Sequence, residues 1–188
     1  MSVTTMELRK PSLIELPSYT AALERGWSPD TMRAATGLDE LVKIAADSDA
    51  FVASMEDREG RGDAVTLPDG TLVKRLPGFR RWLWDGEFCG AINIRWQSGT
   101  SELPPHVLGH VGYSVVPWKR NLGYATRALG LLLPDAKAVG LDFVELTTDP
   151  ENLPSQRVIL ANGGRLRRRF FKSQAYGGGE SLLFRIDL

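Results

Sequence analysis

Between Gly112 and Thr126 the sequence can build a binding site for an anion. A strand-like run ends at Pro117, a short turn with Arg120 and Gly123 follows, and a helical pattern begins directly after it. The first N–H groups of a helix have no partner inside the helix, and the helix dipole is positive there, which favours a phosphate. Gly123 lets the phosphate approach the backbone, and Arg120 can add a charge-assisted contact. Taken alone, the segment also fits a plain strand–helix connection with a capping turn.

A second polar group follows about thirty residues later, after the next strand-like run. Asn152 is suited to cap a short helix, and Pro154 is tolerated in the first turn of that helix. Ser155 lies in the same turn, where it either faces the mouth between two strands or only binds backbone. Gly163-Gly164 is a C-terminal signal for this helix. The glycine pattern of a dinucleotide fold and the Walker pattern are both absent from the chain.

These two segments together resemble the GNAT superfamily of N-acetyltransferases. The acetyl-CoA motif of that family, Q/R-x-x-G-x-G/A, corresponds to residues 120–125. Its downstream Asn-x-x-Ser, Val-Ile and Asn-Gly-Gly correspond to residues within 152–164. Residues 109–114 further resemble a bacterial subgroup of predicted acetyltransferases. The resemblance covers 90–188 well and 1–89 only in the order of elements.

The resemblance implies that acetyl-CoA is the co-substrate and that its pantetheine lies between two splayed parallel strands. Val115 and Val116 are expected to offer backbone groups to pantetheine, and an N–H near Ser114 or Val115 is expected to polarise the acetyl carbonyl. Asn152 and Ser155 are expected to flank the thiol end. The residues expected to hold the pyrophosphate are Arg120, Asn121, Gly123, Tyr124, Ala125 and Thr126.

Acetyl transfer to an amine by direct attack in a ternary complex requires that a base or a water chain takes a proton from the ammonium. His110 is the candidate base because imidazole titrates near neutral pH, the alternative being a structural histidine bonded across the sheet. Glu145 is the reserve candidate, for which a solvated or salt-bridged role is favoured. Ser155 is the candidate proton donor to the departing thiolate, the alternative being a serine that only bonds backbone.

The acceptor side of the site has no signature in the sequence. Arg95, Asn93 and Trp84 are expected to line it, and Arg95 with Asn93 can bind a carboxylate or form a surface ion pair. Trp82 and Trp84 share a strand face, for which a core position is favoured. A small polyamine, an antibiotic, an amino acid and a protein N-terminus all remain open as acceptors. The alternative function is a non-catalytic domain that binds acyl-CoA as a sensor.

The elements that position these groups follow from periodicity and from turn residues. Strands are predicted over 4–9, 80–84, 87–95, 107–116, 143–148, 165–171 and 182–186. Helices are predicted from Ser12 onward and over 38–55, 122–139 and 152–162, with loops at 57–70 and 97–106. Asp85-Gly86 predicts a hairpin, and Pro134 predicts a bend or break near 130–134. In the 38–55 helix the expected apolar face carries Leu38, Leu41, Val42, Ala45, Ala46 and Val52.

The predicted fold class is therefore α/β (α+β), in a single GNAT-like domain over 1–188. Its mixed, mostly antiparallel sheet is expected to splay at a central parallel strand pair and to be flanked by helices. Residues 1–75 are expected to give the N-terminal strand and the acceptor-side helices. Residues 76–188 are expected to give the sheet and the acetyl-CoA-binding core.

Composition limits the alternatives. The chain has 188 residues, of which 43% are hydrophobic and 24% charged, as in an average globular protein. Its 23 Lys and Arg balance its 23 Asp and Glu, which argues against a nucleic-acid partner. The sequence has neither an apolar run of about 20 residues nor a signal peptide, so a cytoplasmic protein without a membrane partner is predicted. Cys89, His106 and His110 are too few to predict a metal site.

One basic run, 165–172, stands apart from this balance. As a regular strand it would place Arg165, Arg167 and Arg169 on one face, for which a solvated sheet face is the favoured interpretation. RNA or ribosome binding is the weaker alternative. Edge strands near the C-terminus can also pair into a homodimer, but the sequence does not decide this.

Overall fold

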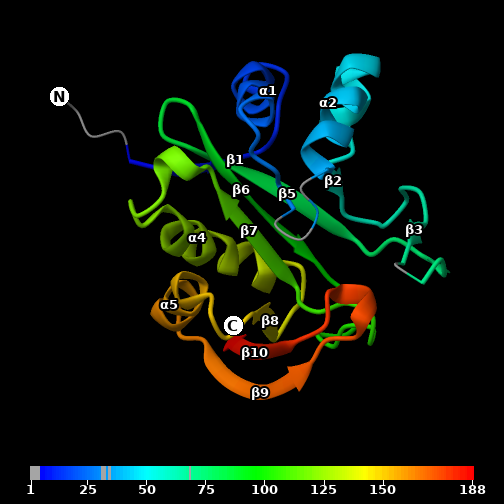
Figure 1. Ribbon diagram of the computed structural model, residues 1–188, viewed down its shortest axis with the longest axis vertical. Helices are drawn as coiled ribbons and strands as arrows, with labels where there is room; N and C mark the ends of the chain where they lie inside the picture. Colours follow the sequence, from blue (N-terminus) through cyan, green and yellow to red (C-terminus); the bar gives the residue numbers. More distant parts are fainter. Residues whose placement is uncertain (1–4, 31–32, 34, 68) are drawn as a thin grey trace.

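The computed structural model describes residues 5–30, 33, 35–67 and 69–188 and contains two large antiparallel sheets flanked by helices, besides a small two-stranded sheet (Figure 1). The first half of the chain comprises β1 (Glu7–Arg9), α1 (Leu16–Glu24), α2 (Thr36–Ala46), α3 (Ser48–Ala53), β2 (Glu56–Asp57), β3 (Val65–Thr66), β4 (Leu72–Val73), β5 (Gly78–Trp84) and β6 (Phe88–Arg95). The second half comprises β7 (Val111–Val115), the 3₁₀ turn η1 (Pro117–Lys119), α4 (Tyr124–Ala138), β8 (Phe143–Thr148), α5 (Leu153–Ala161), β9 (Arg165–Phe171), η2 (Gln174–Tyr176) and β10 (Glu180–Asp187).

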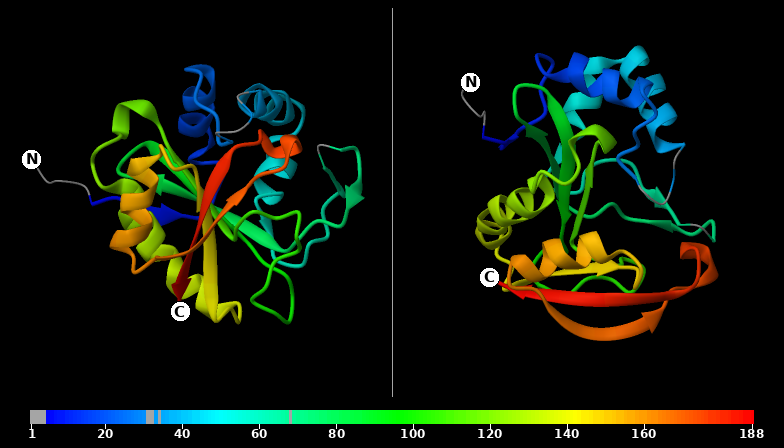
Figure 2. Two further views of the ribbon diagram at one scale, coloured as in Figure 1. Left: turned by 60° about the horizontal axis from the view of Figure 1, so that its bottom comes forward. Right: turned by 60° about the vertical axis from the view of Figure 1, so that its left-hand side comes forward.

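The two sheets part between β7 and β8. The first has the strand order β1-β5-β6-β7 with β2 beside β5, and the second has the order β8-β10-β9. β7 and β8 thus lie at the edges of their own sheets and share no ladder, and Figure 2 shows the sheets diverging. They meet at one point, where the His110 N–H donates to Glu145 O at 2.7 Å. The α/β class and the splayed sheet predicted from the sequence are confirmed.

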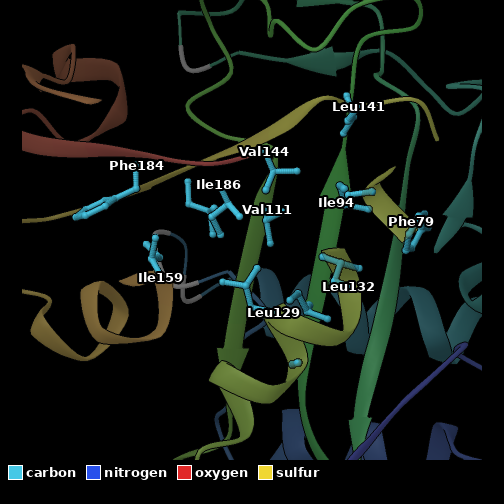
Figure 3. Close-up of a cluster of buried hydrophobic side chains, with 14 of the residues drawn as sticks. Phe79, Ile94, Val111, Leu129, Leu132, Leu141, Val144, Ile159, Phe184 and Ile186 are labelled. Carbon is cyan, nitrogen blue, oxygen red and sulfur yellow. The ribbon is translucent and has the colours of Figure 1, made fainter. Parts of the chain in front are cut away.

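Two apolar clusters lie on opposite faces of the first sheet. One is enclosed by both sheets, α4 and α5, and includes Ile94, Leu129, Val144 and Phe184 (Figure 3). The other lies under α1 to α3, where Trp82 is fully buried and stacks on Tyr19 with ring centroids 4.8 Å apart. The core position favoured for Trp82 is therefore confirmed, and each face of the first sheet is covered by its own helices (Figure 2).

The single helix predicted over 38–55 is wrong, because two helices meet at Asp47. The Asp47 backbone is extended, and its carboxylate accepts a hydrogen bond from the Ala50 N–H at 2.9 Å, which caps α3. The predicted apolar face is wrong at Leu38 and Val42, which are 66% and 70% exposed, whereas Leu41 and Val52 pack against the cluster under α1 to α3. Glu40 faces inward instead, where its carboxylate pairs with Arg80 at 3.0 Å.

Other differences have local causes. Of the bend or break predicted near 130–134, the break is wrong, because α4 runs through Pro134 and buries Leu132 and Ala136 on either side. Such packing outweighs one missing backbone hydrogen bond. The predicted loop 57–70 contains β3, which pairs with β4, and the strand predicted over 107–116 begins only at Val111. Residue 4 of the predicted first strand lies outside the described residues.

The Asp85-Gly86 hairpin is confirmed, and Gly86 takes a φ of +115° between β5 and β6. In β9, by contrast, the predicted alternation of arginines is wrong. Leu183 pairs with Arg168 and Phe184 with Leu166, so Arg167 is an extra residue in the ladder. Arg165 and Arg168 consequently share a face. No helix in the described part of the chain is long and apolar enough to cross a membrane.

Candidate functional site

The turn between β7 and α4 presents free N–H groups to an open space. Asn121 and Gly123 take positive φ values of +63° and +75°, and Gly123 is the N-cap of α4. A Cβ atom on Gly123 would meet nothing within 4 Å, so the space beside it is open. The first bond inside the helix runs from the Arg127 N–H to Gly123 O at 3.0 Å. The preceding N–H groups therefore remain available to an anion; they belong to Tyr124, Ala125 and Thr126.

The β5–β6 hairpin braces this turn through Asp85. The Asp85 carboxylate accepts hydrogen bonds from Lys119 Nζ at 3.0 Å and from Tyr124 OH at 2.5 Å. The bond to Asp85 raises the pKa of Tyr124 to about 12. Burial alone would raise the pKa of Asp85, but the bonds from Tyr124 and Lys119 outweigh it and lower that pKa. Because the Tyr124 hydroxyl is engaged, Tyr124 can offer only its backbone N–H to an anion.

Arg120 lies at the start of the same turn. Its side chain is exposed, and its Nε donates to Val115 O at 3.3 Å. The guanidinium thus lies between the end of β7 and the N-terminus of α4. The structure therefore brings the expected residues 120–126 together around one open space.

The backbone of β7 alternates between its partner β6 and the gap toward β8. The Arg95 N–H donates to His110 O at 2.9 Å, and the Val116 N–H donates to Cys89 O at 3.0 Å. In an antiparallel ladder every second residue bonds the partner, so Gly112 and Ser114 face β6. The backbone groups of the residues between them point away from β6, and Val115 is the residue of this set next to the anion-binding turn.

Because of this alternation, the N–H groups of Val115 and Val116, for which the sequence predicted the same role, point in different directions. Val115 directs its N–H toward the gap, whereas the Val116 N–H is already bound to Cys89 O. The Ser114 hydroxyl lies on the face of the first sheet that α1 to α3 cover. There it accepts a hydrogen bond from Trp27 Nε1 at 3.1 Å and donates one to Ser28 O at 3.4 Å. Ser114 therefore ties the segment after α1 to β7.

Tyr113 and Ser155 meet across the gap between β7 and α5. The Tyr113 hydroxyl lies 2.8 Å from Ser155 Oγ and donates to Ser155 O at 3.3 Å. Asn152 caps α5 by accepting from the Ser155 N–H at 3.1 Å, as predicted. Burial raises the pKa of Tyr113, and the bond with Ser155 offsets part of that rise. Tyr113 was not identified from the sequence, although it lies two residues before Val115 on β7 and so on the same side of the strand.

His110 joins the two sheets at the point where they meet. The imidazole is fully buried, and its Nδ1 accepts the Glu145 N–H at 2.9 Å. The proton of the neutral ring is therefore on Nε2, which has no hydrogen-bond partner among the described residues. Burial is the main cause that lowers the pKa of His110 to about 4. These contacts fit the alternative role stated for His110 in the sequence analysis, a structural histidine bonded across the sheet.

The remaining candidates lie on the face of the sheets away from α4 and α5. Glu145 accepts two hydrogen bonds from Arg185, at 2.8 and 3.1 Å. With its amide nitrogen toward β7, Asn93 donates to Gly112 O at 3.0 Å and accepts from Arg95 at 3.3 Å, so these two acceptor-side candidates are neighbours.

Trp84 is not brought together with Asn93 and Arg95. The ladder pairs Arg95 with Gly78 at one end of β5 and Trp84 with Phe88 at the other end. Gly78, the partner of Arg95, and Trp84 are therefore about 20 Å apart along β5, at 3.3 Å per residue. Trp84 lies instead beside Arg9, whose guanidinium is 5.2 Å from the ring centroid.

No group of three or more His, Cys, Asp or Glu in residues 5–30, 33, 35–67 and 69–188 is arranged to hold a metal ion.

Three comparisons with known proteins show what this chain is similar to. A family model described as "Acetyltransferase (GNAT) domain" matches residues 6–165. A search of curated proteins finds no match. Similar solved structures include the microcin C7 self-immunity acetyltransferase MccE in complex with acetyl-CoA and AMP, at 10% identity and a TM-score of 0.64, covering 97% of this chain and 92% of that one.

Two further structures come from named bacteria. RimJ of Mycobacterium smegmatis, in complex with CoA-disulfide, is 19% identical with a TM-score of 0.59, covering 97% of this chain and 81% of that one. A putative ribosomal-protein-serine acetyltransferase of Vibrio cholerae is 15% identical with a TM-score of 0.59, covering 99% and 97%. At these identities the likeness establishes a common fold.

Proposed function

Because the chain belongs to the GNAT family of acetyltransferases, we propose that it moves an acetyl group from acetyl-CoA to an amine by direct attack in a ternary complex. The observation that carries the proposal is the turn before α4, where the space beside Gly123 is open and the first N–H groups of the helix are available. That donor set suits a pyrophosphate.

The chain holds acetyl-CoA along the gap between β7 and β8. The N–H groups of residues 124–126, with Arg120, bind the pyrophosphate. The edge of β7 that faces the gap binds the amide groups of pantetheine as a neighbouring strand would. The Val115 N–H donates to the acetyl carbonyl oxygen, where negative charge develops during attack.

Ser155 and Tyr113 act at the sulfur. If the Tyr113 hydroxyl turns its one proton from Ser155 O to Ser155 Oγ, over their 2.8 Å contact, the Ser155 proton is left to point elsewhere. The Ser155 hydroxyl then donates to the departing thiolate. We assign no proton transfer to His110, whose Nδ1 is bound to the Glu145 N–H, or to Glu145, whose carboxylate is bound by Arg185. A water chain removes the proton of the ammonium.

The test is calorimetric titration with acetyl-CoA of the wild type, Gly123→Trp and the control Gly163→Trp. Gly163 also has a positive φ and open surroundings, but it lies at the end of α5. Binding that is lost only in Gly123→Trp supports the site, and thiol release with a panel of amines then tests transfer. Binding without release for any amine favours an acyl-CoA sensor, and no binding by the folded wild type refutes both functions.

A further inference from the structure

A groove of about 300 Å³ lies on the face of the second sheet that points away from α5. Leu182, Phe184 and Ile186 of β10 point into the core under α4 and α5. Leu183 and Arg185 alternate with them and face the other side, and Leu183 lines the groove. The opposite wall is formed by residues 102–108 of the loop before β7.

The groove begins where the two sheets meet. Glu145 lines it, and the backbone of Glu145 is bound to His110 at the point from which β7 and β8 diverge (Figure 2). The acetyl-CoA site proposed above lies on the opposite side, with α4 and α5. A molecule in the groove can therefore approach the gap without crossing the side that holds the pyrophosphate.

The groove is lined by two carboxylates, Glu102 and Glu145, and by two cationic side chains, Arg168 and Lys172. Arg185 behind it pairs with Glu145 at 2.8 Å, and Lys172 at its end pairs with Asp149 at 2.7 Å. Arg168 forms no ion pair with any residue that the structure describes, since both lining carboxylates pair with Arg185. Its guanidinium lies 5.1 Å from the ring centroid of Phe170, which is another lining residue. The free cation thus stands beside an aromatic wall.

The loop wall carries apolar side chains beside Glu102 and is held in place. Leu103, Pro104 and Leu108 line the side formed by the loop, and Tyr176 closes the end toward η2. The Tyr176 hydroxyl donates to His106 O at 2.9 Å, which ties η2 to the loop across the groove. A volume of this size is at the lower end of small-molecule sites. It suits a compact ligand with a ring.

We propose, resting on the proposed function, that this groove binds the acetyl acceptor and that the acceptor is a small aromatic amine that carries a carboxylate. The ring packs between the loop and Phe170, and the Arg168 guanidinium binds the carboxylate in the two-pronged geometry that guanidinium and carboxylate share. The amine then points toward the gap between β7 and β8.

Steady-state thiol release with matched amines tests this assignment. The probes are tryptophan against tryptamine and phenylalanine against phenethylamine, because each pair differs only in the carboxylate. The wild type is expected to show a kcat/KM at least about tenfold higher for the carboxylated member, since a charge-assisted contact contributes that much. Arg168→Gln is expected to lose this preference, mainly through KM.

The matched control is Arg165→Gln. Arg165 shares the face of Arg168 on β9, is exposed and does not line the groove, so its loss is expected to leave the preference unchanged. If the wild type acetylates amines but does not prefer carboxylated ones, or if both arginine variants behave alike, the assignment of the groove is refuted while the acetyltransferase function stands.

Calorimetry with tryptophan keeps the two proposals separable, because it requires no turnover. Tryptophan binding that is weakened in Arg168→Gln and kept in Arg165→Gln supports the groove even if no acetyl group is transferred. Absence of tryptophan binding by a wild-type protein that binds acetyl-CoA overturns the groove assignment alone. Absence of acetyl-CoA binding overturns the proposed function and with it the role of the groove as an acceptor site, even where tryptophan still binds.

Discussion

Replacing Gly123 by alanine should separate acetyl-CoA binding from folding. Gly123 has a φ of +75° at the N-cap of α4, a conformation that an L-residue adopts at a cost of about 1–2 kcal/mol. Gly163 has a φ of +82° at the end of α5, and a Cβ atom would meet nothing within 4 Å at either position. Gly123→Ala and Gly163→Ala should therefore lower the free energy of unfolding by similar amounts.

The two variants should differ in affinity for acetyl-CoA. The new methyl group of Gly123→Ala occupies the space onto which the N–H groups of residues 124–126 open. Losing one hydrogen bond to a charged group removes about 1.5–3 kcal/mol. At 1.4 kcal/mol per tenfold change, the Kd should rise about 10- to 100-fold. Gly163→Ala should bind like the wild type.

The measurements are thermal unfolding and calorimetric titration with both acetyl-CoA and coenzyme A. The melting temperature should fall by about 2–8 °C in both variants, as expected for a loss of 1–2 kcal/mol in a chain of this size. The weaker binding should be the same for both ligands, since they share the pyrophosphate. Equal affinities in the two variants, or a loss confined to acetyl-CoA, would refute the placement of the pyrophosphate beside Gly123.

Three further predictions concern the contacts around the site. Tyr113→Phe and Ser155→Ala should each lower kcat about tenfold with little change in KM for acetyl-CoA. The kcat of the double variant should be no lower than that of the less active single variant, whereas additive losses would contradict a shared role. Asp85→Asn should lower the pKa of Tyr124 from about 12 toward its usual value near 10 in an ultraviolet titration and weaken acetyl-CoA binding several-fold; an unchanged pKa would show that Asp85 does not hold the Tyr124 proton. His110 binds a proton near pH 6.5 when unfolded but only near pH 4 when folded, so its contribution to stability is full above pH 6.5 and is lost as the pH falls toward 4. Denaturant unfolding at several pH values should show that the free energy of unfolding falls by about 3 kcal/mol between pH 6.5 and pH 4 because of His110. His110→Gln should lack this part of the pH dependence, and an equal pH dependence in both proteins would contradict the prediction.

The sequence predicted those parts of the site that short-range rules govern. Gly123, Asn152 and Gly163 were identified because a helix end needs a cap or a positive φ within a few residues. The Asp85-Gly86 hairpin follows from the same kind of local preference. The cap at Asp47 is also local, but the run of apolar residues across it favoured one long helix.

The contacts that the sequence did not predict join distant residues. Tyr113 is 42 positions from Ser155, and Glu40 is 40 positions from Arg80. Neither pairing has a periodic or spacing signal, because it depends on the angle at which the two sheets and α2 pack. The extra residue at Arg167 likewise depends on how β9 pairs with β10. Because of this extra residue, the Arg168 side chain lies on the face of the sheet that lines the groove.

Contacts with β8 and α5 fix the position of β7 beside the gap. Where the two sheets meet, His110 is bound by both backbone and side chain to Glu145, and further along β7 Tyr113 is bound to Ser155 of α5. Between these contacts neither strand has a ladder partner on the facing side. Backbone groups left without such a partner need water or a ligand, so the amide groups of pantetheine can replace water there without breaking a bond of the fold. A change at His110 should therefore alter acetyl-CoA binding through the width of the gap, even though the His110 side chain does not touch the ligand.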